Sequence, residues 1–282
     1  MSRAILFLRS LLFALVMLVA TLIWAPVCFL AAPLSYNQRY YITSRWNVFI
    51  IWLAKVLCGI RYEIKGMENL PDQPVILLSK HQSAWETIFL LCNMPRPLVF
   101  VFKKELLYVP FFGWALGLLR MIPIDRNNGK DAFAQVVVQG RKRLADGQWI
   151  IMFPEGTRIP VGERGRYKGG GARLAVETNT VVVPIALNPG HCWPKNSFIK
   201  KPGLVTVSIG QPMSPEGLSA VDLMQQVENW IESEMRGFHL LTILLHRHRH
   251  RRRKPNPHNN GPTILEAATS IIAGSTTARA AT

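Results

Sequence analysis

His81 and Glu86 are the residues of this sequence whose types and spacing best fit acid–base chemistry. An apolar, strand-like run ends at the histidine, and the carboxylate follows five positions later inside an apolar, helix-like run. A neutral imidazole at such a turn can accept a proton, and a nearby carboxylate can fix its tautomer. Taken alone, the pair is more typical of a capping turn with a solvated glutamate.

A second segment suited to chemistry is Phe153-Pro-Glu-Gly-Thr-Arg158, which also follows a predicted strand. Gly156 allows the backbone to approach a ligand closely, and Arg158 carries a planar fork that suits a phosphate. Glu155 is expected to fix the arginine or a substrate hydroxyl. We assign Glu155, Gly156, Thr157 and Arg158 to substrate binding, against the alternative of an ordinary turn.

Three further cations stand where an anionic substrate could meet them. Lys103 ends a predicted strand, Arg126 follows another, and Lys168 lies in the basic, glycine-rich loop 164–173. Such a loop presents amide hydrogens and cations to an anion, although the spacing of a P-loop is absent. Any one of these residues alone is more typical of a solvated charge. Together with the histidine turn they indicate an anion site.

The elements that position these residues alternate between strand-like and helix-like segments after Gly59. The predicted strands are Arg61–Lys65, Val75–Ser79, Leu98–Phe102, Met121–Ile124, Trp149–Phe153, Val181–Leu187 and Val205–Ile209. The predicted helices are Ala84–Met94, Tyr108–Leu119, Asp131–Ala145, Gly170–Thr178 and Ser214–Arg236. This alternation predicts an α/β fold, with a single mixed and largely internal sheet flanked by helices, over residues 61–237.

Residues 1–60 are predicted to be membrane-anchoring helices that precede this domain. Leu11 to Ala32 contains no charge, and a helix over that run would reach about 33 Å, the thickness of a hydrocarbon core. Pro26 and Pro33 are expected to kink or end the helix. A second apolar stretch, Trp46 to Ile60, suggests two helices that enter one leaflet and return. The alternatives are a secretory signal peptide and a buried core helix.

Composition supports a membrane-associated protein with anionic partners. The 282 residues are 49% apolar and carry a formal net charge of +16, an unusual combination for a soluble protein. Residues 238–282 form a basic, low-complexity tail that we expect to be disordered and to which we assign no role. The four cysteines are far apart in sequence, so they suggest neither a disulfide framework nor a zinc site. Metal ligation is not expected.

These segments resemble the glycerolipid acyltransferases, most closely the bacterial 1-acyl-sn-glycerol-3-phosphate acyltransferases, over roughly Trp46 to Trp230. The likeness consists of four ordered blocks and one lysine-bearing segment. The first block, H-x-x-x-x-D, corresponds to His81–Glu86, and the third, F-P-E-G-T-R, is matched in full by Phe153–Arg158. The second block corresponds to Gly113 to Arg126, the fourth to Val183–Ile185, and the lysine-bearing segment before block two to Lys103–Leu106. One position departs from the pattern. Glu86 stands where the family usually has Asp, and its carboxylate is one methylene further from the backbone.

The resemblance implies transfer of a fatty acyl group from acyl-CoA or acyl-carrier protein to the sn-2 hydroxyl of lysophosphatidic acid. It implies His81 as general base with Glu86 orienting it, and phosphate binding by Arg158 and Lys103, assisted by Arg126 and Lys168. No cofactor is expected, and the partners would be the two substrates and membrane lipids, not nucleic acid. The expected location is the bacterial inner membrane, with the catalytic domain on its cytoplasmic face. The rival interpretations are an acyltransferase with another acceptor, such as glycerol-3-phosphate or a lyso-ornithine lipid, and a non-catalytic binder of anionic lipid.

Overall fold

The computed structural model describes residues 2–109, 112–125 and 129–253. The chain divides into two units, Met1–His239 and Leu240–Thr282. What is described of the second unit is the continuation of one helix to Arg253.

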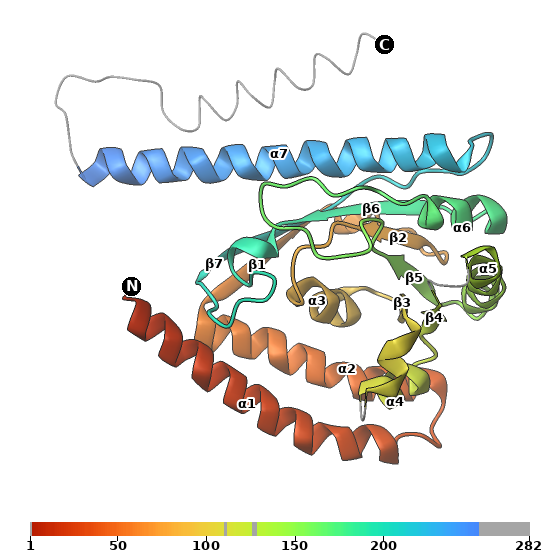
Figure 1. Cartoon of the computed structure of the whole chain (residues 1–282), viewed down its shortest axis with the longest axis horizontal. Helices are drawn as coiled ribbons and strands as arrows, with labels where there is room; N and C mark the ends of the chain where they lie inside the picture. The colour runs from red at the N-terminus through yellow and green to blue at the C-terminus, as the bar shows by residue number, and fades with distance from the viewer. Residues whose placement is uncertain (1, 110–111, 126–128, 254–282) are drawn as a thin grey trace, which may run out of the picture. The chain divides into compact units, whose positions relative to one another are not determined.

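A seven-stranded sheet forms the core of the first unit (Figure 1). Its strands lie in the order β1-β7-β6-β2-β5-β3-β4, and each neighbouring pair is parallel except β6 and β7. The strands are β1 (Ile60–Lys65), β2 (Ile76–Ser79), β3 (Leu98–Lys103), β4 (Ile122–Ile124), β5 (Trp149–Met152), β6 (Val182–Leu187) and β7 (Gly203–Ile209). The mixed sheet is therefore confirmed, and the predicted strands occur with ends shifted by one or two residues.

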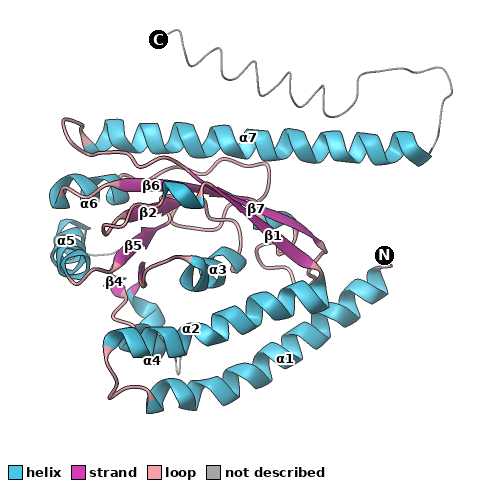
Figure 2. Cartoon of the chain, turned by 180° about the vertical axis from the view of Figure 1, so that it is seen from behind, coloured by secondary structure: helices cyan, strands magenta, loops and turns pink. Residues whose placement is uncertain are grey.

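Helices cover both faces of this sheet (Figures 1 and 2). The regular helices are α1 (Arg3–Leu30), α2 (Tyr36–Leu53), α3 (Trp85–Asn93), α4 (Phe112–Leu118), α5 (Gly129–Ala145), α6 (Gly170–Thr178) and α7 (Ala220–Arg253). Short turns of other helix types are Ala54–Cys58, Met67–Asn69, Lys104–Tyr108 and Pro189–His191. In both views α3 and the α1–α2 pair lie on one side of the sheet, and residues 220–239 of α7 lie on the other.

The carboxyl ends of five strands meet at one edge of the sheet, because β6, β2, β5, β3 and β4 run parallel. β2 lies between β6 and β5 in this set, and all four of its residues are buried. Apolar strands of this kind are typical of a sheet covered on both faces. Open α/β sheets bind ligands at this edge, and His81 follows the end of β2.

The N-terminal helix α1 is long and apolar enough to cross a membrane, and only 11% of its most apolar window is buried. Its exposed large apolar residues include Leu8, Leu15, Leu22 and Ile23. An exposed apolar surface of this extent is typical of contact with a membrane or another protein, so the interpretation as a buried core helix is wrong. The helix contains Pro26 and ends at Leu30, before Pro33.

α1 also packs against the rest of the first unit. Ser10 accepts a hydrogen bond from the backbone of Lys200 at 2.8 Å, and the ring of Phe13 meets that of Trp193 edge-on at 5.2 Å. A cleaved signal peptide would remove these contacts. They favour a helix that remains part of the folded protein.

The C-terminal helix α7 differs from its predicted bounds. It begins at Ala220 and runs to Arg253, beyond the expected end at Arg236 and into the region that we expected to be disordered. The sequence explains the extension, because residues 238–254 contain neither glycine nor proline before Pro255. The remainder of the tail, 254–282, lies outside the described residues.

We expect Gly171→Ala to destabilise the first unit by about 1–3 kcal/mol, because a Cβ at this position of α6 would lie 2.4 Å from Cδ2 of Leu78. Leu78 is fully buried in β2, so a shift of its side chain would disturb the residues packed around it. Gly169→Ala is the matched control, since a Cβ there meets no atom within 4 Å. Thermal unfolding of both variants in detergent would measure the difference, and equal midpoints would contradict the packing of α6 on β2.

Candidate active site

His81 and Glu86 lie in contact at the end of β2. The imidazole Nδ1 and the Oε1 of Glu86 are 2.8 Å apart. The side chain of His81 is 16% exposed, whereas that of Glu86 is fully buried. A carboxylate in this position holds the Nδ1–H tautomer, so the Nε2 lone pair is available to accept a proton. The spacing in the sequence therefore does bring the two side chains together.

The same carboxylate oxygen also organises the turn before α3. Oε1 of Glu86 accepts hydrogen bonds from the backbone N–H groups of Gln82 and Ser83, at 2.7 and 2.6 Å. Ser83 in turn accepts from the backbone N–H of Trp85 at 3.1 Å, where α3 begins. The extra methylene of Glu86, relative to Asp, thus still allows a bond to the imidazole, and the turn itself fixes the carboxylate.

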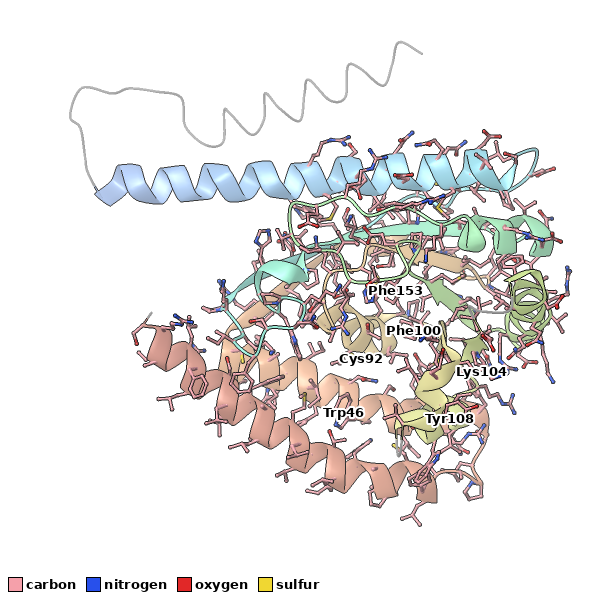
Figure 3. All side chains as sticks on the ribbon, viewed as in Figure 1. Trp46, Cys92, Phe100, Lys104, Tyr108 and Phe153 are labelled. Carbon is pink, nitrogen blue, oxygen red and sulfur yellow. The ribbon has the colours of Figure 1, made fainter. Side chains whose placement is uncertain are left out.

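An aromatic ring from a neighbouring strand end supports the imidazole. Phe153, the residue after β5, stacks on His81 with ring centroids 4.0 Å apart and an interplanar angle of 16°. Phe100 of β3 stacks in turn on Phe153, with 5.8 Å between the two ring centroids (Figure 3). Stacking of this kind limits the ring rotation of His81, so that Nδ1 stays with its carboxylate partner.

Glu155 faces inward, which corrects the sequence prediction for this residue. Its Oε2 accepts from the backbone N–H of His81 at 3.0 Å, and its Oε1 accepts from Nζ of Lys80 at 2.6 Å. The residue is buried, and both oxygens are engaged. Glu155 therefore joins the turn after β5 to the turn after β2, and these contacts leave it unsuited to hold Arg158 or a substrate hydroxyl.

A buried cluster continues from Glu155 to the C-terminal helix. Nζ of Lys80, whose side chain is 1% exposed, also lies 2.8 Å from Oε1 of Glu232 in α7. Tyr167 donates to the same Glu232 oxygen at 2.8 Å. Burial, together with Glu155 and Glu232, raises the pKa of Tyr167 well above its usual range, so its hydroxyl keeps the proton that it donates. One ammonium, one phenol and the backbone N–H of His81 thus bind two buried carboxylates.

The rest of the turn after β5 brings the predicted phosphate-binding residues to the same edge. Gly156 adopts φ +67°, a conformation that favours glycine, and a Cβ there would lie 3.0 Å from Nζ of Lys168. The carbonyl of Arg158 and, more distantly, the hydroxyl of Thr157 accept from Lys195, at 2.9 and 3.5 Å. The guanidinium of Arg158 makes no ion pair with another described residue. The backbone N–H of Ile159 donates to the carbonyl of His81 at 2.8 Å, so the turn that carries Arg158 lies directly beside the histidine turn.

Lys103 lies on the other side of β5, at the end of β3. It is 52% exposed and pairs with Glu105 at 3.1 Å, an exposed contact that contributes little and exchanges readily for a substrate anion. Arg126 lies outside the described residues. Within the described ranges, no group of three or more His, Cys, Asp or Glu side chains is arranged to hold a metal ion.

Sequence reasoning missed Lys80, Phe153 as a stacking partner, Tyr167 and Glu232. A signal existed for Lys80, because a lysine directly after an apolar, fully buried strand needs a partner for its charge. No such signal marked Glu232, which lies on a polar-faced helix and reaches Lys80 across 152 positions of sequence. Its role depends on how α7 packs.

Comparisons with known proteins identify relatives for most of the chain. The Acyltransferase family model matches residues 61–188. The chain is 46% identical over 232 residues to the 1-acyl-sn-glycerol-3-phosphate acyltransferase of Pseudomonas aeruginosa, covering 80% of this chain and 90% of that protein. It is 32% identical to 1-acyl-sn-glycerol-3-phosphate acyltransferase alpha of Mus musculus, covering 60% and 61%.

A solved structure has the same fold. The crystal structure of the 1-acyl-sn-glycerophosphate acyltransferase from Thermotoga maritima superposes with a TM-score of 0.68, at 22% identity. The match covers 82% of this chain and 95% of the other. At that identity the likeness concerns the arrangement of helices and strands.

We expect Lys80→Met to destabilise the first unit by about 3–5 kcal/mol, because it leaves Glu155 and Glu232 buried without their cation. The loss should also displace the turn that carries His81, so activity should fall in the fraction that stays folded. Lys65→Met is the control, since Lys65 forms an exposed pair with Glu63 that contributes at most about 1 kcal/mol. Unfolding midpoints and acyl transfer would be measured together; a Lys80→Met protein with wild-type values for both would show that the cluster positions nothing.

Proposed function

Because the chain belongs to the 1-acyl-sn-glycerol-3-phosphate acyltransferase family, we propose that it transfers a fatty acyl group to the sn-2 hydroxyl of 1-acyl-sn-glycerol-3-phosphate and so forms phosphatidic acid. The proposed donor is a thioester, acyl-CoA or acyl-carrier protein. The observation that carries the proposal is the 2.8 Å contact between His81 and Glu86, at the sheet edge where the F-P-E-G-T-R turn packs on the same histidine.

The reaction follows from what these side chains can do. Nε2 of His81 takes the proton of the acceptor hydroxyl while the hydroxyl oxygen attacks the thioester carbonyl carbon. Glu86 stabilises the imidazolium that forms. The tetrahedral intermediate then breaks its C–S bond, and the imidazolium returns the proton to the departing thiolate sulfur. The ester and a free thiol are the products, and His81 ends as it began.

The acceptor's phosphate is proposed to bind Arg158 and Lys103, with Lys168 nearby. All three are cations at the same sheet edge as His81, and charge-assisted hydrogen bonds of this kind contribute about 1.5–3 kcal/mol each. Gly156 and Thr157 form the backbone of the turn that presents Arg158. Arg126 is proposed to assist in phosphate binding, and this role rests on the sequence alone.

The membrane is the proposed location of the reaction, with the catalytic residues on the cytoplasmic face of a bacterial inner membrane. The exposed apolar surface of α1 supports insertion into lipid, where the acyl chains of the acceptor lie. The cysteines support a reducing compartment: the four of them are free. Burial raises the pKa of Cys92 to about 12 and of Cys192 to about 11, so both remain unreactive thiols.

The proposed activity is tested by free-thiol release from acyl-CoA with a panel of acceptors: 1-acyl-sn-glycerol-3-phosphate, glycerol-3-phosphate, a lyso-ornithine lipid and other lysophospholipids. Release that depends on the first acceptor is the expected result. Release with another acceptor alone would reassign the substrate. Binding of phosphatidate vesicles without thiol release would identify a non-catalytic lipid binder.

We expect His81→Ala to lower the rate of transfer roughly 10²–10⁴-fold, because it removes the general base. Glu86→Gln should also lower the rate while the protein stays folded, since the amide oxygen can still accept from Gln82 and Ser83. Steady-state kinetics and unfolding midpoints would be measured for both variants. Wild-type turnover in His81→Ala would exclude this histidine as the base.

We expect Arg158→Ala to raise the KM for 1-acyl-sn-glycerol-3-phosphate about tenfold, the equivalent of about 1.4 kcal/mol of lost phosphate binding. The turn should survive, because its contact to Lys195 uses the backbone carbonyl of residue 158. The KM for the acyl donor serves as the internal control and should not change. An unchanged KM for the acceptor would remove Arg158 from the phosphate site.

A further inference from the structure

A cavity of about 570 Å³ opens beside the histidine turn and has no part in the mechanism described above. Its walls are the turn after β5, with Pro160 and Val161, and the loop after β6, with Gly190, Lys195 and Lys201. Gln82, the residue next to His81, completes the lining. The cavity therefore combines direct contact with the catalytic turn and two exposed lysines.

Hydrogen bonds and close packing fix the walls of this cavity. Gln82 accepts from the backbone N–H of Gly190 at 3.3 Å, and a Cβ on Gly190 would lie 2.7 Å from Val161. Nζ of Lys195 donates to the carbonyl of Arg158 at 2.9 Å. The backbone N–H of Lys201 donates to the carbonyl of Cys192 at 2.8 Å. The two lysines are thus carried on a loop that is fastened to both catalytic turns.

The sheet order places the strands that precede Lys103 and the two cavity lysines on different sides of β2. β2, which carries His81, has β6 on one side and β5, β3 and β4 on the other. Lys103 follows β3, whereas Lys195 and Lys201 follow β6. The transfer reaction requires two substrates that meet at one imidazole, and both are anionic. A phosphate held by Lys103 and Arg158 leaves Lys195 and Lys201 available for the second substrate.

We propose that this cavity binds the phosphate-bearing arm of the acyl donor, with Lys195 and Lys201 as its charge partners. The proposal rests on the proposed function. Acyl-CoA and acyl-carrier protein share a phosphopantetheine arm whose thioester carries the acyl group, so one cationic cavity beside the base serves either donor. Lysine ammonium groups bind phosphate oxygens through charge-assisted hydrogen bonds, and the amide of Asn196, in the same wall, adds a neutral donor.

Lys201→Gln is the sharpest test, because it removes a charge without touching the contact between Lys195 and Arg158. We expect the KM for acyl-CoA to rise about tenfold, with the KM for 1-acyl-sn-glycerol-3-phosphate unchanged. Lys201→Arg should restore the donor KM. Lys142→Gln, which removes an exposed lysine on α5, is the matched control and should leave every parameter at the wild-type value.

The donor panel separates phosphate recognition from a general effect on turnover. It contains acyl-CoA, acyl-carrier protein and an acyl thioester of N-acetylcysteamine, which lacks phosphate. Lys201→Gln should weaken transfer from the phosphate-bearing donors and leave transfer from the phosphate-free thioester unchanged. An effect on only one of the two natural donors would identify that donor as the source of the bound phosphate.

Three results would overturn the proposal. One is an unchanged KM for every donor, another is an equal loss with the phosphate-free thioester, and the third is a higher KM for the acceptor instead of the donor. Titration of the full-length protein with CoA by calorimetry is independent of turnover. If the wild type transfers no acyl group to any acceptor, the proposed function fails, while weaker CoA binding by Lys201→Gln would still support the cavity assignment and equal binding would refute it.

Discussion

Glu155 is the residue through which the two catalytic turns hold one another in place. One of its oxygens binds the backbone of His81, and the other binds the ammonium of Lys80, which also binds Glu232 of α7. Removing charges from water costs several kcal/mol per ion, so none of these groups is stable in the interior without the others. If the turn after β5 moved away from the histidine, a buried charge would become exposed or would lose its partner. The position of the base therefore depends on the fold as a whole.

The parallel part of the sheet brings the residues proposed to bind the two substrates to the edge where the base lies. Residues that are far apart in sequence, such as His81, Arg158 and Lys195, follow three strands whose carboxyl ends share one edge. The loop after β6 also contacts α1, through Ser10 and Trp193. A single loop thus contributes both a wall of the cavity beside the base and a contact surface for the apolar N-terminal helix, which couples the site to the element that is proposed to lie in lipid.

The fold was predictable from the sequence because its strands are short apolar runs separated by turns and helical periods. The same reading located His81 and Glu86, whose interaction spans five positions. It did not find the partners of Glu155, because Lys80 lies 75 positions from it and Glu232 lies 152 positions from Lys80. Contacts at such separations follow from the order of the strands and the packing of α7, neither of which the pattern of apolar residues determines. The end of α7 was misjudged for a different reason: the basic composition suggested disorder, whereas the absence of glycine and proline allowed the helix to continue.

The glutamate at position 86 shows how a departure from a family pattern can preserve geometry. A longer side chain has more conformations to lose, and a single bond to an imidazole would restrain it poorly. Here one oxygen of Glu86 accepts from two backbone N–H groups of the turn as well as from His81. The backbone bonds restrain the carboxylate next to the imidazole, so the longer side chain still reaches His81. The carboxylate partner of the base is therefore fixed within six residues of sequence, and Phe153 adds a stacking contact from the turn after β5. The position of the base relative to the cations that are proposed to bind phosphate depends on Glu155 and the packing of distant helices.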